Sequence, residues 1–246
     1  MSSRYYKDGG VDKASVTTIT GQLKQDWMPY WVSNCIRDYA LEGLQNITNT
    51  NELPDHPVGT ILRLDEVRNL IEKACKNYME VSKSAMYIGS KVHDAIETYI
   101  ATGREPFKPS DEVLAGFLSF LEWVDKYNVK FLSSEQTVYG DKFAGTLDLN
   151  CLLNGKSYVI DFKTTSIKED GPAYLEHRYQ VAAYRSCIKT EGCGILYLHK
   201  VTGYPLWKDT SATYEADIRV FNILVDLFYA SHSNVSKRIY KQRKAV

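Results

Sequence analysis

The stretch Phe143-Ala-Gly-Thr-Leu-Asp-Leu-Asn-Cys-Leu-Leu-Asn-Gly-Lys-Ser-Tyr-Val-Ile-Asp-Phe-Lys-Thr-Thr165 decides the fold of this chain. The dipeptide Asn154-Gly155 lies between two largely apolar runs, and this pattern predicts a two-residue β-hairpin turn. In such a hairpin Leu153 pairs with Lys156, and every pair farther from the turn follows by counting outward. One face of the hairpin then carries a set of core side chains: Leu147, Leu149, Cys151, Tyr158, Ile160 and Phe162.

The opposite face of the predicted hairpin carries two acids and a lysine. Counting outward places Asp148 opposite Asp161, and Lys163 projects from the same face because it lies two residues farther along the strand. Two carboxylates about 5 Å apart repel each other. A hard divalent cation such as Mg²⁺ or Mn²⁺ between them would relieve the repulsion. The alternative is a solvated strand face with ordinary surface charges, but the three groups gather at the end away from the turn, which favours a polar pocket.

Composition limits the possible classes of protein. The 246 residues are 44% hydrophobic and 24% charged, which is typical of a globular chain. Thirty basic residues balance thirty acidic ones, so a nucleic-acid site would have to be a local basic groove. The five cysteines are scattered without a C-x-x-C pair, which favours a reducing compartment over a disulfide framework or zinc ribbon. No signal-peptide-like or membrane-spanning apolar run occurs, so we expect a cytoplasmic protein without membrane contact.

The remaining pattern predicts helices on both sides of the hairpin in sequence. We expect residues 1–14 to be irregular and residues 15–20 to form a short strand or the approach to a helix. The later elements are expected in this order: helices from Pro29, over 67–81, over 84–102 and over 111–127, a polar loop at 48–59, strands at 129–139, 194–199 and 203–207, and helices over 173–189 and 213–230. Two regions follow from this order, an N-terminal helical region (1–83) and a core with a C-terminal helix (84–246).

Other polar residues at suggestive spacings have both a structural and a functional interpretation. His93 and Glu97 lie four apart on a predicted helix, where a lone histidine commonly serves only to make structural hydrogen bonds. Glu135 lies in a predicted strand and would ordinarily be solvated. Gln180 and Tyr184 share one helix face. No P-loop, G-x-S-x-G or H-E-x-x-H sequence is present, so ATP-driven chemistry, a serine-hydrolase elbow and a zincin helix are not supported.

Four segments together resemble the motifs of the PD-(D/E)XK nuclease superfamily, RecB-like branch, in the order of that family. They are Gly89-Ser-Lys-Val-His93, Phe143-Ala-Gly-Thr-Leu-Asp148, Val159-Ile-Asp-Phe-Lys-Thr164 and Gln180-Val-Ala-Ala-Tyr184. The resemblance covers roughly residues 84–200. In addition, Ser15-Val-Thr-Thr-Ile-Thr20 is similar to the N-terminal segment of mitochondrial genome-maintenance exonucleases and their phage relatives.

This resemblance implies an α/β fold with a restriction-endonuclease-like core, in which helices flank a mixed central sheet, with N-terminal helical additions and a C-terminal helix. It implies that His93, Asp148, Asp161 and the carbonyl of Phe162 bind one or two Mg²⁺ or Mn²⁺ ions. It assigns Lys163 to positioning a water or stabilising developing charge.

The resemblance also implies catalytic-site roles for Gln180 and Tyr184, either on the nucleic-acid strand or in steadying the lysine. Glu135 and Glu97 are secondary candidates for the site. Some RecB-like relatives hold an iron–sulfur cluster through one early and three late cysteines. After Tyr184 this chain has only Cys187 and Cys193, so we expect no such cluster.

The implied activity is metal-dependent hydrolysis of DNA, exonucleolytic and directed at single strands or DNA ends, in replication, recombination or repair. DNA is the implied partner, together with other replication or recombination proteins, and the phage relatives make a phage-encoded origin compatible. Two alternatives stay open: an endonuclease or junction resolvase on the same scaffold, and a non-catalytic DNA-binding module.

Overall fold

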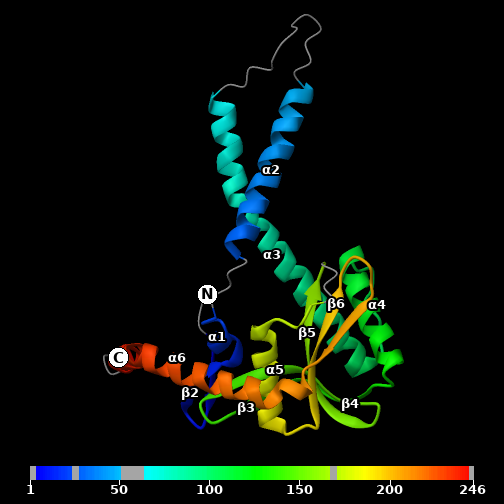
Figure 1. Ribbon diagram of the computed structural model, residues 1–246, viewed down its shortest axis with the longest axis vertical. Coiled ribbons are helices and arrows are strands. Elements are labelled where there is room, and N and C mark those ends of the chain that lie inside the picture. The colour runs from blue at the N-terminus through cyan, green and yellow to red at the C-terminus, as the bar shows by residue number, and fades with distance from the viewer. Residues whose placement is uncertain (1–3, 24–27, 51–63, 167–170, 244–246) are drawn as a thin grey trace, which may run out of the picture. The chain divides into compact units, whose positions relative to one another are not determined.

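The computed structural model describes residues 4–23, 28–50, 64–166 and 171–243 (Figure 1). The chain forms two compact units. One comprises residues 1–23 and 89–246 and contains the sheet, and the other comprises residues 24–88. Helix α3 (Leu64–Thr102) contributes residues to both units. No helix within the described ranges combines the length and apolar character needed to cross a membrane.

The larger unit is built on a seven-stranded mixed sheet. Its strands are β1 (Tyr5–Asp8), β2 (Val11–Ser15), β3 (Lys130–Tyr139), β4 (Phe143–Leu153), β5 (Lys156–Thr165), β6 (Gly192–His199) and β7 (Pro205–Asp209). The order is β1-β2-β4-β5-β6-β7, and β3 also pairs with β4. The β2–β4 and β5–β6 pairs are parallel, whereas the other pairs are antiparallel.

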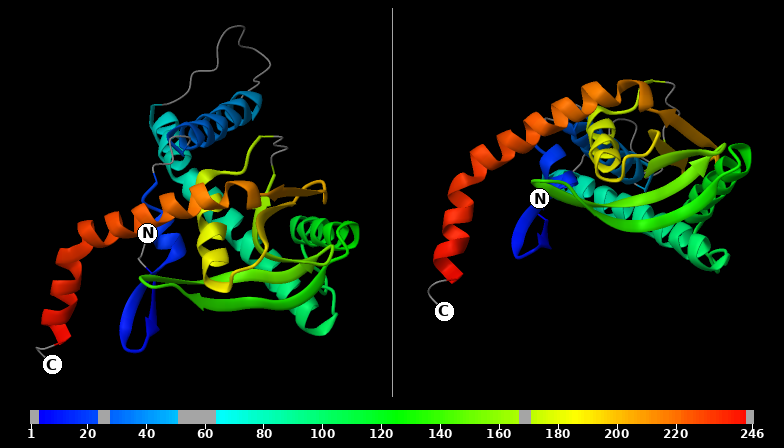
Figure 2. Two further views of the ribbon diagram at one scale, coloured as in Figure 1. Left: turned by 60° about the horizontal axis from the view of Figure 1, so that its bottom comes forward. Right: turned by 90° about the horizontal axis from the view of Figure 1, so that it is seen from below.

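Helices cover both faces of this sheet. On β5, Asp161 contacts Gln180 of α5 (Leu175–Ile188), whereas the neighbouring Phe162 packs against Phe120 of α4 (Asp111–Lys126). Because successive strand residues point to opposite faces, α5 and α4 lie on opposite sides of the sheet; Figure 2 shows this arrangement. Helix α6 (Tyr214–Arg243) packs against α5. The predicted α/β class, with a mixed central sheet flanked by helices and a C-terminal helix, is therefore confirmed.

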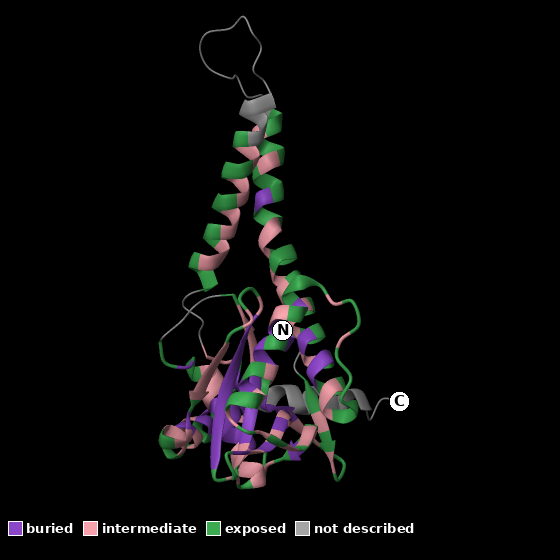
Figure 3. Cartoon of the chain, turned by 90° about the vertical axis from the view of Figure 1, so that its right-hand side faces the viewer, coloured by how far each residue is buried: buried purple, intermediate pink, exposed green. Residues whose placement is uncertain are grey.

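Burial follows from this layering. Strand β6 is buried throughout, β5 has four buried residues in succession, and β4 alternates buried with half-buried residues along most of its length (Figure 3). The sequence pattern assigned only one face of the hairpin to the core, but Val159 and Asp161 on the other face are as buried as Ile160 and Phe162. Helix α5 covers that second face. The polar pair of β5 is therefore buried and does not face solvent along an open strand.

The predicted hairpin turn and register are confirmed. Asn154 and Gly155 have φ values of 49° and 85°, as a type I′ turn requires. The pairing runs from Leu153 with Lys156 to Leu149 with Ile160, in the register counted from the turn.

The expectation of an irregular N-terminus is wrong. Residues from Tyr5 to Ser15 form the β1–β2 hairpin, which turns at Gly9 and Gly10 with φ values of 55° and 87°. Two glycines in succession supply the positive φ values of such a turn without steric cost. Helix α1 (Val16–Thr20) follows, and the Ser15 side chain caps the N-terminus of this helix.

Two helices predicted over 67–81 and 84–102 are a single helix, α3, so the expected break is wrong. Gly89 lies inside it, and its cost of about 1 kcal/mol relative to alanine does not end the helix. In the smaller unit, α2 (Met28–Thr50) begins next to Pro29 as predicted and packs against α3 where Gly43 meets Leu70. Most of the polar loop predicted at 48–59 lies outside the described residues.

Candidate active site

The site lies where one edge of β4 is left without a strand partner. Along one edge β3 pairs with β4 from Leu152 to Ala144, with a register shift between Phe131 and Ser133. The other edge pairs with β5 down to Leu149 and with β2 only at Phe143 and Ala144. Residues 145–148 thus have no strand partner on this edge, between the parts of β4 that pair with β5 and with β2. Asp148 is the first of them after the paired Leu149.

At this position a hydrogen bond to the Asp148 side chain, in place of a backbone pair, connects β4 to β5. Its Oδ2 accepts a hydrogen bond from the Phe162 backbone N–H at 2.6 Å. Its Oδ1 lies 3.6 Å from Nδ1 of His93, a residue of α3 whose ring also packs edge-on against Phe162. Asp148 therefore links the helix that carries His93 to the strand segment between Asp161 and Lys163.

Glu135 completes a group of ligand-type atoms around Asp148. On β3, Ser134 pairs with Leu149 and Gln136 with Leu147, so the same register places Glu135 opposite Asp148. One ligand atom each from His93, Glu135 and Asp148 lie within 4.8 Å of one another. Glu135 has a φ of 47°, unusual for a non-glycine residue in a strand. Such strain costs about 1–3 kcal/mol and is concentrated at functional sites.

A second group of buried polar residues lies on the α5 face of β5. Asp161, which is 1% exposed, forms an ion pair through Oδ2 with the Lys163 ammonium. Its Oδ1 accepts a hydrogen bond from Nε2 of Gln180 at 2.8 Å, and the same nitrogen donates to the Tyr184 hydroxyl at 3.1 Å. Gln180 and Tyr184 are 8% and 2% exposed. Their burial favours positioning of Asp161 over direct contact with a nucleic-acid strand.

The titration properties of the aspartates and the lysine reflect this crowding. Burial raises the pKa of Asp161, and the Lys163 ammonium opposes that rise. Burial would also raise the pKa of Asp148, but His93, the Lys163 charge and the Phe162 N–H together outweigh it, and the pKa of Asp148 is lowered. Burial disfavours the charged form of Lys163, yet the charges of Asp161 and Asp148 raise its pKa. Lys163 therefore stays a cation at neutral pH.

The two histidines near the site behave differently. Burial alone would lower the pKa of His93, but Asp148 more than offsets it and the pKa of His93 is raised. His177, which the sequence reasoning did not single out, lies on α5 and bonds through Nδ1 to the Tyr197 hydroxyl at 2.9 Å. Burial, with the charge of Lys163, lowers the pKa of His177 to about 3, so this ring stays neutral.

The donors around Asp148 suit a divalent cation. Two carboxylates and one imidazole are ligands that Mg²⁺ or Mn²⁺ accepts, with the oxygens favouring the harder ion. Burial raises the pKa of Glu135, and the neighbouring Asp148 carboxylate adds to the rise. A cation at this position would relieve that repulsion. The residues present therefore have the donor atoms that a divalent metal ion requires.

The structure brings together most of the predicted site residues, in two linked groups. In the first group, His93 contacts Asp148, which accepts a hydrogen bond from the Phe162 N–H. The second group is a continuous set of contacts among Asp161, Lys163, Gln180 and Tyr184. Glu135 of β3 belongs to the same group of ligand-type atoms as Asp148, whereas the two Asp161 oxygens contact Lys163 and Gln180. Metal-ligand roles for Asp161 and the Phe162 carbonyl stay predictions.

Comparison of the structure with solved structures finds nucleases at low similarity. An alkaline exonuclease from Laribacter hongkongensis matches with a TM-score of 0.40 and 12% identity, covering 64% of this chain and 86% of that chain. The same exonuclease in complex with dAMP matches with a TM-score of 0.40 and 15% identity, covering 64% and 93%. A phage-related exonuclease from Haemophilus somnus 129PT matches with a TM-score of 0.33 and 9% identity, covering 59% and 82%.

Likeness at this level does not decide the activity of the chain. No protein-family model matches the sequence, and no curated protein sequence is significantly similar to it. The function must therefore be argued from the residues of the site.

Proposed function

We propose that this protein is a metal-dependent nuclease of the PD-(D/E)XK superfamily that hydrolyses phosphodiester bonds of DNA. The observation that carries the proposal is the meeting of His93, Glu135 and Asp148 next to a buried Asp161–Lys163 ion pair. Ligands for a hard cation and a permanently charged lysine are the two elements that stabilise a reacting phosphate.

Each residue has a defined task in this proposal. His93, Glu135 and Asp148 would hold Mg²⁺ or Mn²⁺, with Asp161 and the Phe162 carbonyl as further ligands. The bound ion would polarise the scissile phosphate and lower the pKa of a water molecule. Lys163 places a positive charge where negative charge develops on the phosphate oxygens.

Gln180 and Tyr184 act as positioning residues in this proposal. The Gln180 amide fixes Asp161 Oδ1, and the Tyr184 hydroxyl accepts from the same amide. Because Gln180 binds Oδ1 of Asp161, the other oxygen, Oδ2, is the one that pairs with Lys163. The orientation of the acid and of the lysine is therefore set by α5.

The finer proposal is an exonuclease acting on single strands or DNA ends, in replication, recombination or repair. It follows the sequence resemblance to the RecB-like branch. These processes produce unpaired DNA ends. Other replication or recombination proteins would be the partners of this protein.

A cleavage assay tests the proposal. End-labelled single- and double-stranded DNA is incubated with the protein and Mn²⁺ or Mg²⁺, with and without EDTA. We expect cleavage that requires the metal. The Lys163→Ala variant should lose cleavage by about 10²–10³-fold, the usual effect of removing one charge-stabilising group. Lys156→Ala is the matched control, because Lys156 is exposed at the turn end of the same strand.

The assay also separates the alternatives. An exonuclease leaves closed circular DNA intact and degrades the linear form, whereas an endonuclease or resolvase cuts both. A non-catalytic DNA-binding module would retain DNA without cleaving it in any metal. Full activity of Lys163→Ala would refute the role assigned to the lysine.

A further inference from the structure

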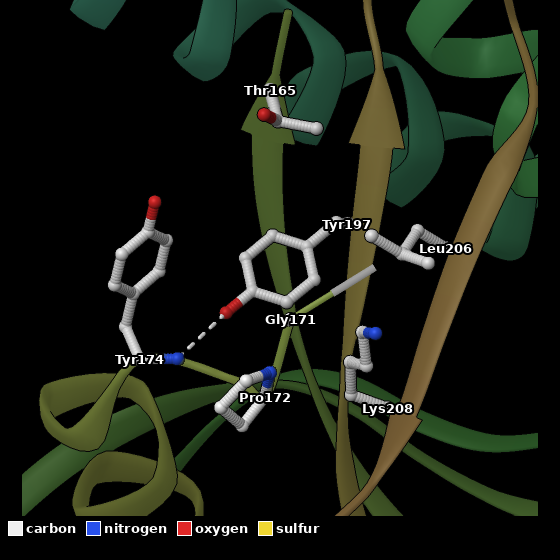
Figure 4. A pocket seen from close by; sticks show the side chains of 7 residues that line it. All are labelled: Thr165, Gly171, Pro172, Tyr174, Tyr197, Leu206 and Lys208. Carbon is white, nitrogen blue, oxygen red and sulfur yellow. Dashed lines mark hydrogen bonds between the residues drawn. The ribbon is translucent and has the colours of Figure 1, made fainter. Parts of the chain in front are cut away.

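The cavity on the α5 face of the larger unit is too small to bind a ligand. It lies between β5, β6, β7 and the segment before α5, where the Tyr197 hydroxyl accepts a hydrogen bond from the Tyr174 backbone N–H at 3.3 Å (Figure 4). Its volume is about 20 Å³, room for about one water molecule. The feature that points to a binding partner lies instead in the smaller unit, on α3.

The smaller unit buries very little apolar surface of its own. Among the side chains described in it, those of residues 28–45 and 65–88, Ala74 alone is buried (Figure 3). Ala74 lies one turn after Leu70, on the side of α3 where Leu70 meets Gly43 of α2. Helices of globular proteins bury an apolar stripe against another element. Two helices that bury one alanine between them do not complete a core.

A second apolar stripe on α3 is exposed. Ile71, Cys75, Met79 and Met86 recur at helical spacing, so they lie on one face of the helix, and we call them the α3 stripe. Ile71 is 52% exposed, Met79 44% and Met86 65%. Cys75 is exposed as well. An exposed apolar surface of this kind marks an interaction site.

Charged residues border the α3 stripe along one edge in alternating order. Glu72, Lys76 and Glu80 each directly follow a stripe residue, and Lys83 continues the row. All four are exposed. A residue that directly follows a member of the stripe lies about 100° farther around the helix. The four therefore share one edge, and from the N-terminal to the C-terminal end the row reads Glu, Lys, Glu, Lys.

This order of charges is complementary to its own reverse. In two antiparallel helices related by a two-fold axis, the two charged edges lie on the same side of the interface and run in opposite directions. Glu72 of one copy then lies opposite Lys83 of the other. Lys76 lies opposite Glu80, and both pairs are centred close to Tyr78, so a single alignment satisfies them. A parallel pair would place the two charged edges on opposite sides, where their charges could not meet.

The same alignment brings apolar side chains together. Met79 lies close to the two-fold axis and meets Met79 of the second copy, and Ile71 lies level with the turn that ends at Met86. Removing these side chains from water supplies the free energy of association. The charges beside them set the orientation of the helices and the choice of partner. The self-complementary order favours a second copy of this chain as that partner.

We propose that the α3 stripe is the dimer interface of this protein, occupied by α3 of a second copy in antiparallel orientation. The two copies then bury the apolar face that one copy alone leaves exposed. The proposal concerns the smaller unit and goes beyond the nuclease function. Association is measured without DNA or metal, so the failure of one proposal leaves the other standing.

Sedimentation equilibrium of the full chain tests the interface. The wild type should be a dimer at micromolar concentrations and dissociate on dilution. Met79→Glu places a charge close to the axis in each copy and should yield monomers, because burial of an unpaired charge is costly. Leu41→Glu is the matched control. Leu41 is 51% exposed and lies two residues before Gly43, on the side of α2 away from α3, so this variant should remain a dimer.

Charge reversal tests the antiparallel order. Lys76→Glu places an acid opposite Glu80 of the second copy, and Glu80→Lys places a base opposite Lys76. Each variant alone should therefore associate about 5–50-fold more weakly than the wild type. An equimolar mixture of the two variants restores opposite charges at these contacts and should dimerise like the wild type. Each chain keeps its substitution in the mixture, so recovery there cannot come from repair of the helix itself.

Three results would overturn the proposal. They are a monomeric wild type throughout the range from about 1 to 100 μM, equal behaviour of Met79→Glu and Leu41→Glu, and no recovery of association in the mixture. A monomeric wild type would assign the α3 stripe to a different partner.

Discussion

Replacing Gln180 by leucine tests whether the buried amide holds Asp161 in its ionised form. Burial, opposed by Lys163, raises the pKa of Asp161 to about 6, above its ordinary value of 3.8. The folded state therefore binds this proton more tightly than the unfolded chain, and the contribution of Asp161 to stability falls as the pH rises from about 4 to about 6. In the folded protein Asp161 is neutral near pH 4 and charged well above pH 6.

The size of the effect follows from the change in charge. A hydrogen bond to a charged group contributes about 1.5–3 kcal/mol, whereas one between neutral groups contributes about 0.5–1.5 kcal/mol. The bond from Gln180 to Asp161 Oδ1 changes from the second kind to the first as the proton leaves. The cost of Gln180→Leu should therefore be about 1–1.5 kcal/mol larger near pH 8 than near pH 4.

Urea unfolding in EDTA measures this difference without interference from bound metal. Tyr184→Phe is the matched control, because the Tyr184 hydroxyl accepts from the same nitrogen of Gln180. Burial raises the pKa of Tyr184 well above its ordinary value, so Tyr184 is neutral throughout and the cost of Tyr184→Phe should not depend on pH. An equal cost of Gln180→Leu at both pH values would refute the reasoning.

Three further predictions concern the framework of the site. Asp217→Ala should lower the free energy of unfolding by about 3–5 kcal/mol, because it leaves Arg178 without its buried bidentate partner; the Arg178→Met, Asp217→Leu double variant should lose less, as urea unfolding would show. Gly145→Ala should cost about 1–3 kcal/mol and reduce cleavage, since a Cβ there lies 2.7 Å from Tyr184 Cε1; unchanged stability and cleavage would contradict this contact. Trp123→Ala, at a fully buried position, should cost about 3–5 kcal/mol while each folded molecule keeps its cleavage rate.

Local signals explain which parts of the fold could be predicted. The Asn154-Gly155 turn fixes the register of its own hairpin, and helical periodicity places α4 and α5 close to their observed positions. The start of α6 is also placed correctly, but the helix continues to Arg243, well past the predicted end at residue 230. The β1–β2 hairpin was missed because β1 and β2 are short and polar. β2 joins the sheet by pairing with β4, and β1 joins it only through β2, which a local pattern cannot reveal.

The position of Glu135 at the site could not be derived from the sequence. It depends on an irregularity between Phe131 and Ser133 that shifts the β3–β4 register, and on a positive φ at Glu135 itself. Neither feature has a local sequence signal. The contact between Gln180 and Asp161 joins residues 19 positions apart across a loop. Motif order predicted their proximity, but only the packing of α5 on β5 shows which atoms meet.

Titration of the protein with Mn²⁺ tests the central claim most directly. Calorimetry should detect binding to the wild type and its loss in Asp148→Asn. This change keeps the shape of the side chain but removes its negative charge from the ligand group of His93, Glu135 and Asp148. Glu122→Gln, an acid of α4 away from this group, should bind Mn²⁺ like the wild type. Binding to Asp148→Asn with undiminished affinity and stoichiometry would contradict the account.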